Sequence, residues 1–388
     1  MEEVLDVAVL EGNPGQLKLL IKEVCSPREL DAFIDFPYRL YRGNPFYVPP
    51  IKSDERITLQ HTNPALDHCD AKYWLAYRGR KMVGRIAGII NHAYITRWGK
   101  KYARFGWFDF EEDVTIAPAL LQHVERWAKD QGMDAVHGPM GFTNFDPAGI
   151  LVDGFDQLAT LSELYNYPYY VRCIEKAGYH KEVDWIEYRI SIPKKVPEKI
   201  SQVASIVKRR NKLTIVNLRK SNDIKQYAYS IFELLNLCYG HLHGMVPLTE
   251  KQIQYYTKRY LSLIRNDYVS LVVDQEGTLI AFGITLPSLS KALQKANGTL
   301  FPFGIFHLMR ALRKNNMAEL CLVAIRPDYQ GKGVNALLME EINKAFTRNG
   351  IVTAESNPEL EDNKQVQSLW SYYEARQHKR RRCYLKYL

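Results

Sequence analysis

The residues best suited to chemistry in this chain form a short glycine-containing loop: Gln330, Gly331, Lys332, Gly333, Val334 and Asn335. An apolar stretch before it, residues 320–325, predicts a strand, and residues 334–348 predict an amphipathic helix that stops at Gly350. Glycines let the chain turn sharply and bring consecutive backbone N–H groups close to one ligand. The helix adds its free N-terminal amides and the positive end of its dipole. The loop therefore predicts a site for a pyrophosphate.

The spacing of the glycines narrows the kind of ligand. The loop lacks the GxxxxGK[ST] pattern of a P-loop and the GxGxxG pattern of a dinucleotide-binding fold. A lone GxG is also found in ordinary turns. The strand before the loop, Pro327 at the strand exit and the helix after it together favour a binding loop over a simple turn.

At this point the sequence resembles the GNAT superfamily of acyl-CoA-dependent N-acyltransferases. Ile325, Arg326 and Pro327, followed by Gln330 and Gly333, match the family's signature, and Asn335 stands where glycine or alanine is usual. The resemblance implies acetyl-CoA or another acyl-CoA as co-substrate and no metal. Its expected ligands are the six loop residues together with Val323, Ala324, Ile325, Ala336 and Asn363.

A second stretch resembles the family's catalytic segment. Asn363 to Trp370 is similar to the family's Asn-x-x-Ala-x-x-Leu-Tyr helix, with Trp370 at the position of the tyrosine that protonates the departing thiolate. The neighbouring Tyr372 and Tyr373 are therefore the candidate acids. Glu355, at the end of a predicted strand, is the candidate base. Two alternatives are His243, in a loop, and the carboxylate of Leu388.

The order of elements predicts an α/β (α+β) fold with two tandem GNAT-like domains, each a mixed, mostly antiparallel sheet flanked by helices. We expect a first domain over residues 1–195, a linker helix over 196–212 and an acyl-CoA-binding domain over 213–388. Strands at 268–273 and 278–286 are expected to form a hairpin, and the segment 292–315 a helix or lid. A helix is expected over 364–377 and a last strand over 383–388.

The N-terminal half has no equivalent of the phosphate loop. Its corresponding strand-to-helix junction, residues 108–113, contains no glycine and carries acidic side chains that repel phosphate. This half resembles the degenerate half of tandem GNAT proteins, which implies one cofactor per chain. Two further stretches, 35–50 and 138–146, are candidates for lining an acceptor site, although packing is the simpler explanation for the first.

Composition restricts the partners. Fifty-two Lys and Arg against 43 Asp and Glu give a net charge of +9, which favours anionic partners such as a CoA nucleotide, nucleic acid or an acidic membrane surface. No long basic stripe with interleaved aromatic residues supports nucleic-acid binding, and the run 379–382 is interpreted as a solvated helix end. The six cysteines are scattered without metal-ligand spacing, and no signal peptide or membrane span is expected. These features predict a cytoplasmic protein.

The leading hypothesis is transfer of an acetyl or longer acyl group from acyl-CoA to an amine on a small molecule or peptide. One alternative is a tandem-GNAT transferase that uses an aminoacyl-tRNA donor, which the pyrophosphate loop disfavours because that donor has no pyrophosphate. The other is a non-catalytic acyl-CoA-binding or scaffold protein, which Asn335 and Trp370 keep open.

Overall fold

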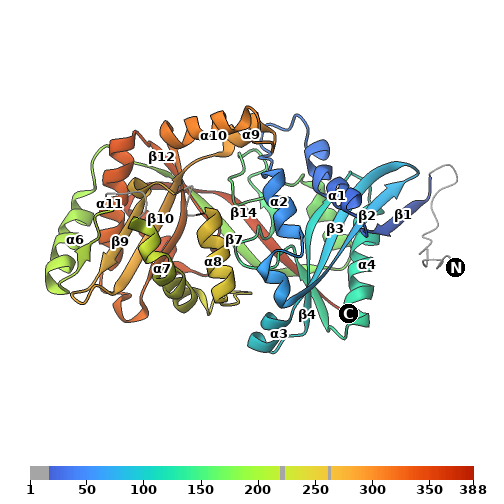
Figure 1. Cartoon of the computed structure of the whole chain (residues 1–388), viewed down its shortest axis with the longest axis horizontal. Coiled ribbons are helices and arrows are strands. Elements are labelled where there is room, and N and C mark those ends of the chain that lie inside the picture. The colour runs from blue at the N-terminus through green and yellow to red at the C-terminus, as the bar shows by residue number, and fades with distance from the viewer. Residues whose placement is uncertain (1–16, 219–222, 261–263) are drawn as a thin grey trace. The chain divides into compact units, whose positions relative to one another are not determined.

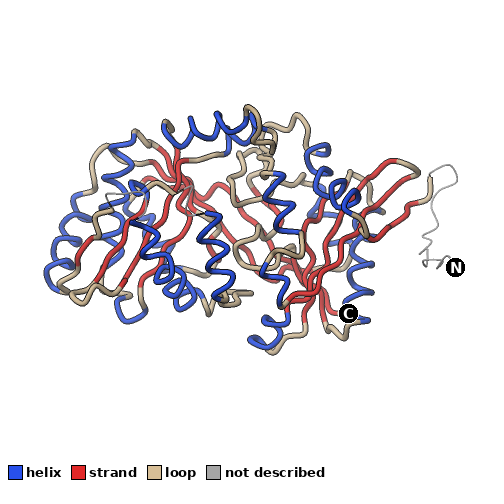
Figure 2. The backbone as a smooth tube through the Cα atoms, viewed as in Figure 1, coloured by secondary structure: helices blue, strands red, loops and turns tan. Residues whose placement is uncertain are grey.

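The computed structural model describes residues 17–218, 223–260 and 264–388. The chain divides into two compact units. Unit 1 comprises residues 1–184, 293–301 and 380–388, and unit 2 comprises residues 185–292 and 302–379. Figures 1 and 2 show that both units are built of helices packed on sheets. Within the described residues, no helix is long and apolar enough to cross a membrane.

Unit 1 is built on a sheet in which all neighbours are antiparallel except β4 and β5, which run parallel. Its strands, in spatial order, are β1 (Leu19–Glu23), β2 (Cys69–Arg78), β3 (Lys81–Asn91), β4 (Tyr102–Phe110), β5 (Ala135–Gly138) and the end of β14 (Glu374–Tyr387), which also pairs with β6 (Ile150–Asp153). Its helices are α1 (Pro27–Leu40), α2 (Lys52–Leu59), α3 (His92–Trp98), α4 (Ile116–Asp130) and α5 (Tyr169–Lys176).

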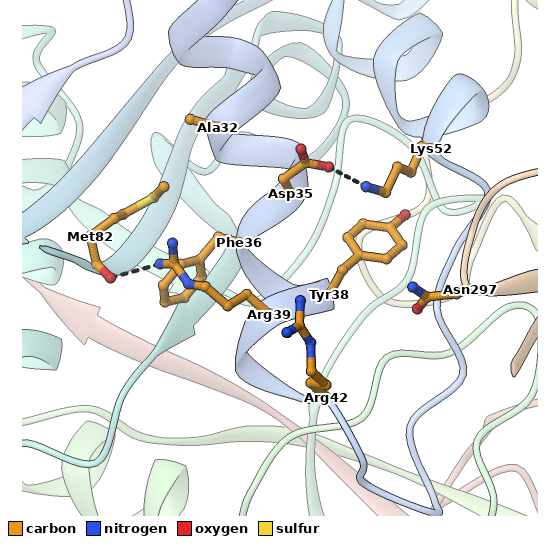
Figure 3. A pocket seen from close by; sticks show the side chains of 9 residues that line it. All are labelled: Ala32, Asp35, Phe36, Tyr38, Arg39, Arg42, Lys52, Met82 and Asn297. Atoms are coloured by element: carbon orange, nitrogen blue, oxygen red, sulfur yellow. Dashed lines mark hydrogen bonds and ion pairs between the residues drawn. The ribbon is translucent and has the colours of Figure 1, made fainter.

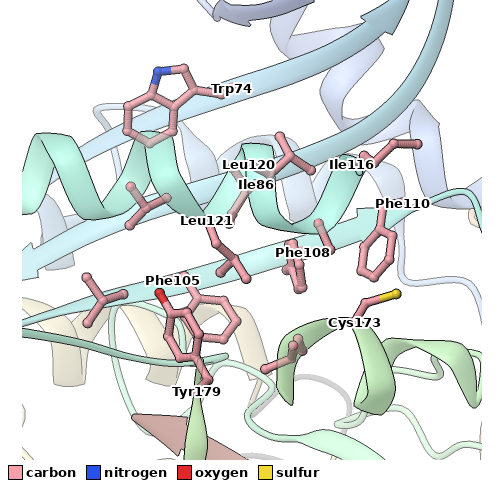
Figure 4. Packing of buried hydrophobic residues seen from close by; sticks show 14 of the residues in the cluster. Trp74, Ile86, Phe105, Phe108, Phe110, Ile116, Leu120, Leu121, Cys173 and Tyr179 are labelled. Carbon is pink, nitrogen blue, oxygen red and sulfur yellow. The ribbon is translucent and has the colours of Figure 1, made fainter. Parts of the chain in front are cut away.

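The core of unit 1 depends on an irregularity in β4. The β3–β4 register shifts between Arg85 and Ala87, and Trp107 has a φ of 42°. The shift changes the alternation of side chains along the strand, so Phe105, Phe108 and Phe110 all join one core beneath α4 and α5, as Figure 4 shows. Trp107 instead packs into the core on the opposite face. Truncating a ring such as Phe110 to alanine would cost about 3–5 kcal/mol.

The strands of unit 2 show the same mixture of directions. Its strands are the end of β7 (His180–Ser191), then β12 (Thr353–Ser356), β11 (Met317–Ile325), β10 (Leu279–Pro287), β9 (Val269–Val273) and β8 (Thr214–Ile215), with β13 (Glu359–Leu360) paired to β7. Only β11 and β12 run parallel among these neighbours. The helices are α6 (Glu198–Arg210), α7 (Asp223–Tyr239), α8 (Glu250–Tyr260), α9 (Ser290–Ala296), α10 (Gly304–Arg313), α11 (Val334–Asn349) and α12 (Lys364–Gln367).

The two halves of the chain repeat one order of elements. The hairpin β2–β3, strand β4, helix α4 and parallel strand β5 correspond to β9–β10, β11, α11 and β12. Each half also ends in a strand that completes the other sheet: β7 pairs with β12, and β14 pairs with β5. The mixed, mostly antiparallel fold with flanking helices confirms the predicted fold class.

Helix α6 is part of the core of unit 2. Ile200, Ala204 and Val207 are buried in a cluster with residues of α11. The segment 292–315 contains most of α9 and all of α10, so the helix expected there is confirmed.

Two predictions near the C-terminus are wrong. The helix expected over 364–377 ends at Gln367 and is followed by one 3₁₀ turn, and β14 already begins at Glu374. The basic run 379–382 therefore lies inside a strand. Lys379 and Arg381 are 0% and 1% exposed. Because each has a buried carboxylate partner, Glu187 at 2.5 Å and Glu163 at 3.2 Å, these charges are tolerated in the interior.

Candidate functional site

In unit 2, the edge of β11 that faces β12 loses its strand partner partway along β11. Parallel pairing with β12 ends at Leu320 and Ser356. Asn357 closes this end, because its backbone N–H donates to Leu320 O (3.2 Å) and its side-chain amide donates to Cys321 O (2.7 Å). In the described parts of the chain, no strand pairs with that side of β11 beyond this point. The strand therefore offers backbone groups beside the predicted pyrophosphate loop.

The loop after β11 has the geometry of an anion site. Gly331 and Gly333 have φ values of 71° and 80°, and Gly333 caps α11. A side chain at Gly331 would meet no atom within 4 Å, whereas one at Gly333 would press on Val207 at 3.0 Å. Among the described residues, no protein acceptor is found for the backbone N–H groups of Gly331, Gly333, Val334 and Asn335. These amides surround a helix N-terminus, where an anion is bound favourably.

The side chains of the loop support its shape. Gln330 donates from its amide to Ile325 O (2.9 Å), so it closes the turn. Arg326 binds Asp328 (2.7 Å), and Tyr329 lies beneath both Arg326 and Lys332. The Arg326 hydrogen bond keeps the pKa of Asp328 below its usual value. Lys332 stays exposed beside the open amides.

Three other predicted ligands contribute differently. The side chains of Val334 and Ala336 are buried in the core of unit 2, so only their backbones are available to a ligand. Asn363 caps α12 by accepting from the backbone N–H of Val366 (3.3 Å). The loop is thus a backbone site more than a side-chain site.

Helix α7 covers the free edge of β11. The Tyr239 hydroxyl donates to Val323 O (2.8 Å) and accepts from Val323 N–H (3.3 Å). The Cys238 thiol donates to Ile325 O (3.1 Å). Burial raises the pKa of Tyr239 to about 12 although the hydrogen bond from the Val323 N–H opposes this, so the hydroxyl is protonated at neutral pH. Any ligand that pairs with Val323 must displace Tyr239, which was not among the site residues predicted from the sequence.

The two candidate tyrosine acids have different surroundings. The Tyr373 hydroxyl accepts a hydrogen bond from the Asn343 amide of α11. Burial raises its pKa to about 12 against the opposing effect of Asn343. Tyr372 is 38% exposed, with Lys199 over its ring. Tyr373 is therefore the better placed of the two to hold a proton in a sheltered position.

Glu355 lies in a buried charged cluster. Its carboxylate is 3.5 Å from Lys379 Nζ and 3.9 Å from the His378 ring. It is directly opposite Glu319 in the parallel register, and Glu319 accepts from Ser288 (2.8 Å). Glu355 is thus part of a buried ion pair within the sheet.

A different carboxylate, Glu359, has the properties of a general base. Trp370 Nε1 donates to both of its oxygens (2.9 and 3.2 Å). Burial raises the pKa of Glu359 to about 7, although hydrogen bonds from Trp370 and Ser356 oppose the shift. A base with a pKa near the working pH is well suited to proton transfer. Trp370, which was selected for its position in the signature, therefore donates hydrogen bonds to a neighbouring carboxylate. Glu359 itself was not among the residues predicted from the sequence.

The alternative bases lie elsewhere. The ring of His243 packs edge-on against Trp185 at a centroid distance of 6.2 Å. Leu388 belongs to unit 1, where its backbone N–H donates to Asp134 O (3.0 Å).

The corresponding junction in unit 1 is filled by protein groups. Asp113, between β4 and α4, accepts from Arg78 Nε and Nη2 (3.0 and 2.6 Å) and from Thr115 N–H and Oγ1 (2.9 and 2.7 Å). Burial favours a higher pKa for Asp113, but the hydrogen bonds from Thr115 and Arg78 lower it overall. Asp109 is likewise bound to buried Arg85 at 2.7 Å. This junction therefore presents carboxylates, and Asp109 and Asp113 are each already paired with an arginine of unit 1.

The aromatic stretch 35–50 lines a cavity of about 330 Å³ in unit 1 (Figure 3). Its lining comprises Ala32, Asp35, Phe36, Tyr38, Arg39, Arg42, Lys52, Met82 and Asn297. Lys52 pairs with Asp35 (2.5 Å), and Arg39 donates to Met82 O (2.8 Å). Because three cations face one acid, the cavity repels a protonated amine and suits an anionic group.

The other stretch, 138–146, is held inside unit 1. Phe142 is fully buried, and its carbonyl accepts from Asn91 (3.0 Å). Asp146 accepts from the backbone N–H of Thr143 (2.9 Å) and lies where a side chain on Gly141 would clash. These contacts explain the segment as packing.

Comparison with known proteins defines the class. Residues 228–371 match the family model described as the Acetyltransferase (GNAT) family. A solved structure, a tandem GNAT protein from the clavulanic acid biosynthesis pathway, has a similar fold with a TM-score of 0.58 at 14% identity, over 95% of this chain and 98% of that one. Residues 228–371 are therefore a GNAT-type N-acyltransferase domain, and the chain as a whole shares its fold with a tandem GNAT protein.

Two curated proteins are similar along most of the chain. Protein YghO of Escherichia coli (strain K12) is 28% identical over 376 residues, which is 95% of either chain. The bacterial ceramide synthase of Caulobacter vibrioides (strain NA1000 / CB15N) is 26% identical over 321 residues, covering 80% of this chain and 82% of that protein.

Proposed function

We propose that this protein transfers an acyl group from acyl-CoA to an amine, and that unit 2 carries the acyl-CoA site. The observation that carries the proposal is the open loop at the start of α11, where four backbone N–H groups lack a protein acceptor within the described residues. Gly331, Lys332, Gly333, Val334 and Asn335 would hold the pyrophosphate. Val323, Ala324 and Ile325 would hold the pantetheine arm once Tyr239 withdraws.

Proton transfer in this proposal uses two buried groups. The attacking amine must be neutral, and Glu359 accepts its proton, because a carboxylate with a pKa of about 7 is half ionised near neutral pH. Tyr373 is the proposed donor to the departing thiolate, since its pKa of about 12 keeps it protonated. Glu355 remains ion-paired with Lys379 and maintains the sheet around the site.

We propose a long-chain amine as the acceptor. This rests on the similarity to a protein named as a ceramide synthase over 80% of the chain. A ceramide is the amide of a fatty acid and a long-chain amino alcohol, so the chemistry is N-acylation. A fatty acyl-CoA is then the matching donor. We also propose a cytoplasmic location, because all six cysteines are free thiols.

The test is binding followed by turnover. Calorimetry with CoA, acetyl-CoA and palmitoyl-CoA should show one site per chain. Release of free CoA should then be measured with a long-chain amino alcohol, a short alkylamine and a peptide amine. Binding with release only on the long-chain amine supports the whole proposal. Binding of acyl-CoA without release of free CoA on any amine would mean that the protein carries acyl-CoA and does not transfer the acyl group. Absence of binding by every thioester would refute the proposal.

A further inference from the structure

Helix α10 and the residue that caps it present an apolar and basic face to solvent. Phe303, Phe306 and Met309 are 73%, 68% and 43% exposed. Single exposed apolar side chains are common on protein surfaces and need no explanation. Three in one short element, two of them phenylalanines, form a patch whose exposure to water is unfavourable unless something covers it.

The helical geometry gathers these side chains on one face. At about 100° per residue, Phe303, Phe306 and Met309 fall with Arg310 and Arg313 within an arc of about 120°. Gly304 and Leu308, on the opposite side, are buried in unit 2. Figure 1 shows α10 on the outer side of that unit. The exposed face, which we call the α10 face, therefore combines an apolar first half with a basic second half.

The chain segment that contains α10 carries charge of one sign. No aspartate or glutamate occurs between Glu276 and Glu319, whereas Lys291, Lys295, Arg310, Arg313 and Lys314 all lie in that interval. Arg310, Arg313 and Lys314 are exposed at the end of the helix. A protein partner that matched only the phenylalanines would leave these cations unmatched.

We infer that the α10 face docks on a membrane surface containing anionic lipid. An amphipathic helix of this composition lies in the plane of the interface, with its phenylalanines at the level of the acyl chains and its basic residues at the headgroups. The apolar half supplies insertion, and each Lys or Arg near the surface adds attraction to the negative leaflet. The inference is independent of the acyl-CoA site, because none of these residues belongs to the loop or to the β11 edge.

The test uses the full chain and sedimentation with vesicles. We expect binding to phosphatidylcholine vesicles that contain phosphatidylglycerol and weak binding to phosphatidylcholine alone. The variant Phe303→Ser/Phe306→Ser should lose at least about tenfold in partitioning. The variant Arg310→Gln/Arg313→Gln should lose about fivefold per charge, and only on the anionic vesicles.

A matched control uses Leu237→Ser/Val352→Ser, which removes two apolar side chains that are 57% and 56% exposed elsewhere in unit 2. Its partitioning should equal that of the wild type. Insertion is measured with Phe306→Trp, whose added fluorescence should be quenched by brominated lipid, whereas that of Leu237→Trp should not.

Two results would overturn the inference. One is equal partitioning of the wild type and both α10 variants, with melting temperatures confirming that the variants are folded. The other is a wild-type dimer that the phenylalanine substitutions convert to a monomer, which would assign the α10 face to a second copy of the chain. Unchanged CoA binding by the α10 variants keeps the membrane result separate from the catalytic one.

Discussion

The junction from β4 to α4 in unit 1 and the junction from β11 to α11 in unit 2 occupy the same place in a repeated order of elements, yet they present opposite chemistry. The first carries Asp113, whose carboxylate accepts four hydrogen bonds from Arg78 and Thr115. The second carries Gly331 and Gly333 and leaves its amides open. A shared fold therefore does not determine whether a junction binds an anion; a few loop residues do.

The difference extends to the groups that follow each parallel strand. After β5, Asp146 is engaged by the backbone of its own loop. After β12, Glu359 accepts hydrogen bonds from Trp370 and Ser356 and has a pKa of about 7. In unit 1 the acid is fixed by a backbone N–H of its own loop, and in unit 2 burial keeps the pKa of the acid near neutrality.

The largest expected effect tests this second contrast. Replacing Glu359 by glutamine should lower kcat about 10²- to 10³-fold, because the amide cannot accept the proton of the amine. In the wild type, the rate should rise with pH through about 7 as Glu359 ionises. This rise of the rate with pH should disappear in the variant. The pH–rate profiles of both proteins measure it, with Glu250→Gln on α8 as control.

A smaller effect is expected when the unit 2 loop is given the acidity of the unit 1 junction. The double substitution Lys332→Glu/Asn335→Asp places carboxylates beside the pyrophosphate site, and like-charge repulsion should weaken CoA binding about tenfold to hundredfold. Calorimetry provides the affinity. The reciprocal control, Glu111→Gln/Glu112→Gln in unit 1, should leave one site per chain; a second site would contradict the comparison.

The substitution Asp113→Asn removes the carboxylate charge that pairs with Arg78 at the unit 1 junction. Loss of the ion pair with Arg78 should reduce the free energy of unfolding by about 1–2 kcal/mol, measured with urea. The pKa of Asp113 is lowered in the folded state, so its contribution is present above the ordinary aspartate value near 3.8 and is lost as pH falls below it. The difference between wild type and variant should therefore shrink in acid. An equal difference at all pH values would mean that Asp113 acts through packing alone.

The smallest effect concerns the cover over β11. Tyr239→Phe removes the hydroxyl that binds both backbone groups of Val323, so CoA should bind about fivefold more tightly, equivalent to one hydrogen bond of about 1 kcal/mol. Tyr255→Phe on α8 serves as a control for loss of a tyrosine hydroxyl. Weaker binding by Tyr239→Phe would instead show that the hydroxyl contacts the cofactor.

The sequence predicted features that depend on neighbours along the chain. The strand, glycine turn and helix around residues 320–348 follow local periodicity and turn chemistry, and they are confirmed. Features that depend on distant partners were missed. Lys379 is in a strand interior because Glu187, far away in sequence, neutralises it, and Glu359 has a raised pKa because the surrounding fold buries it. Neither property is encoded in the residues next to it.

The exchange of final strands has a consequence for how the protein is made. Unit 1 contains residues 1–184, but the strand segment that pairs with β5 is residues 384–387, which are synthesised after unit 2. Its sheet must wait for the whole of unit 2 to be synthesised, with the β5 edge unpaired in the meantime. A fragment that ends after the first half would keep that edge of β5 open.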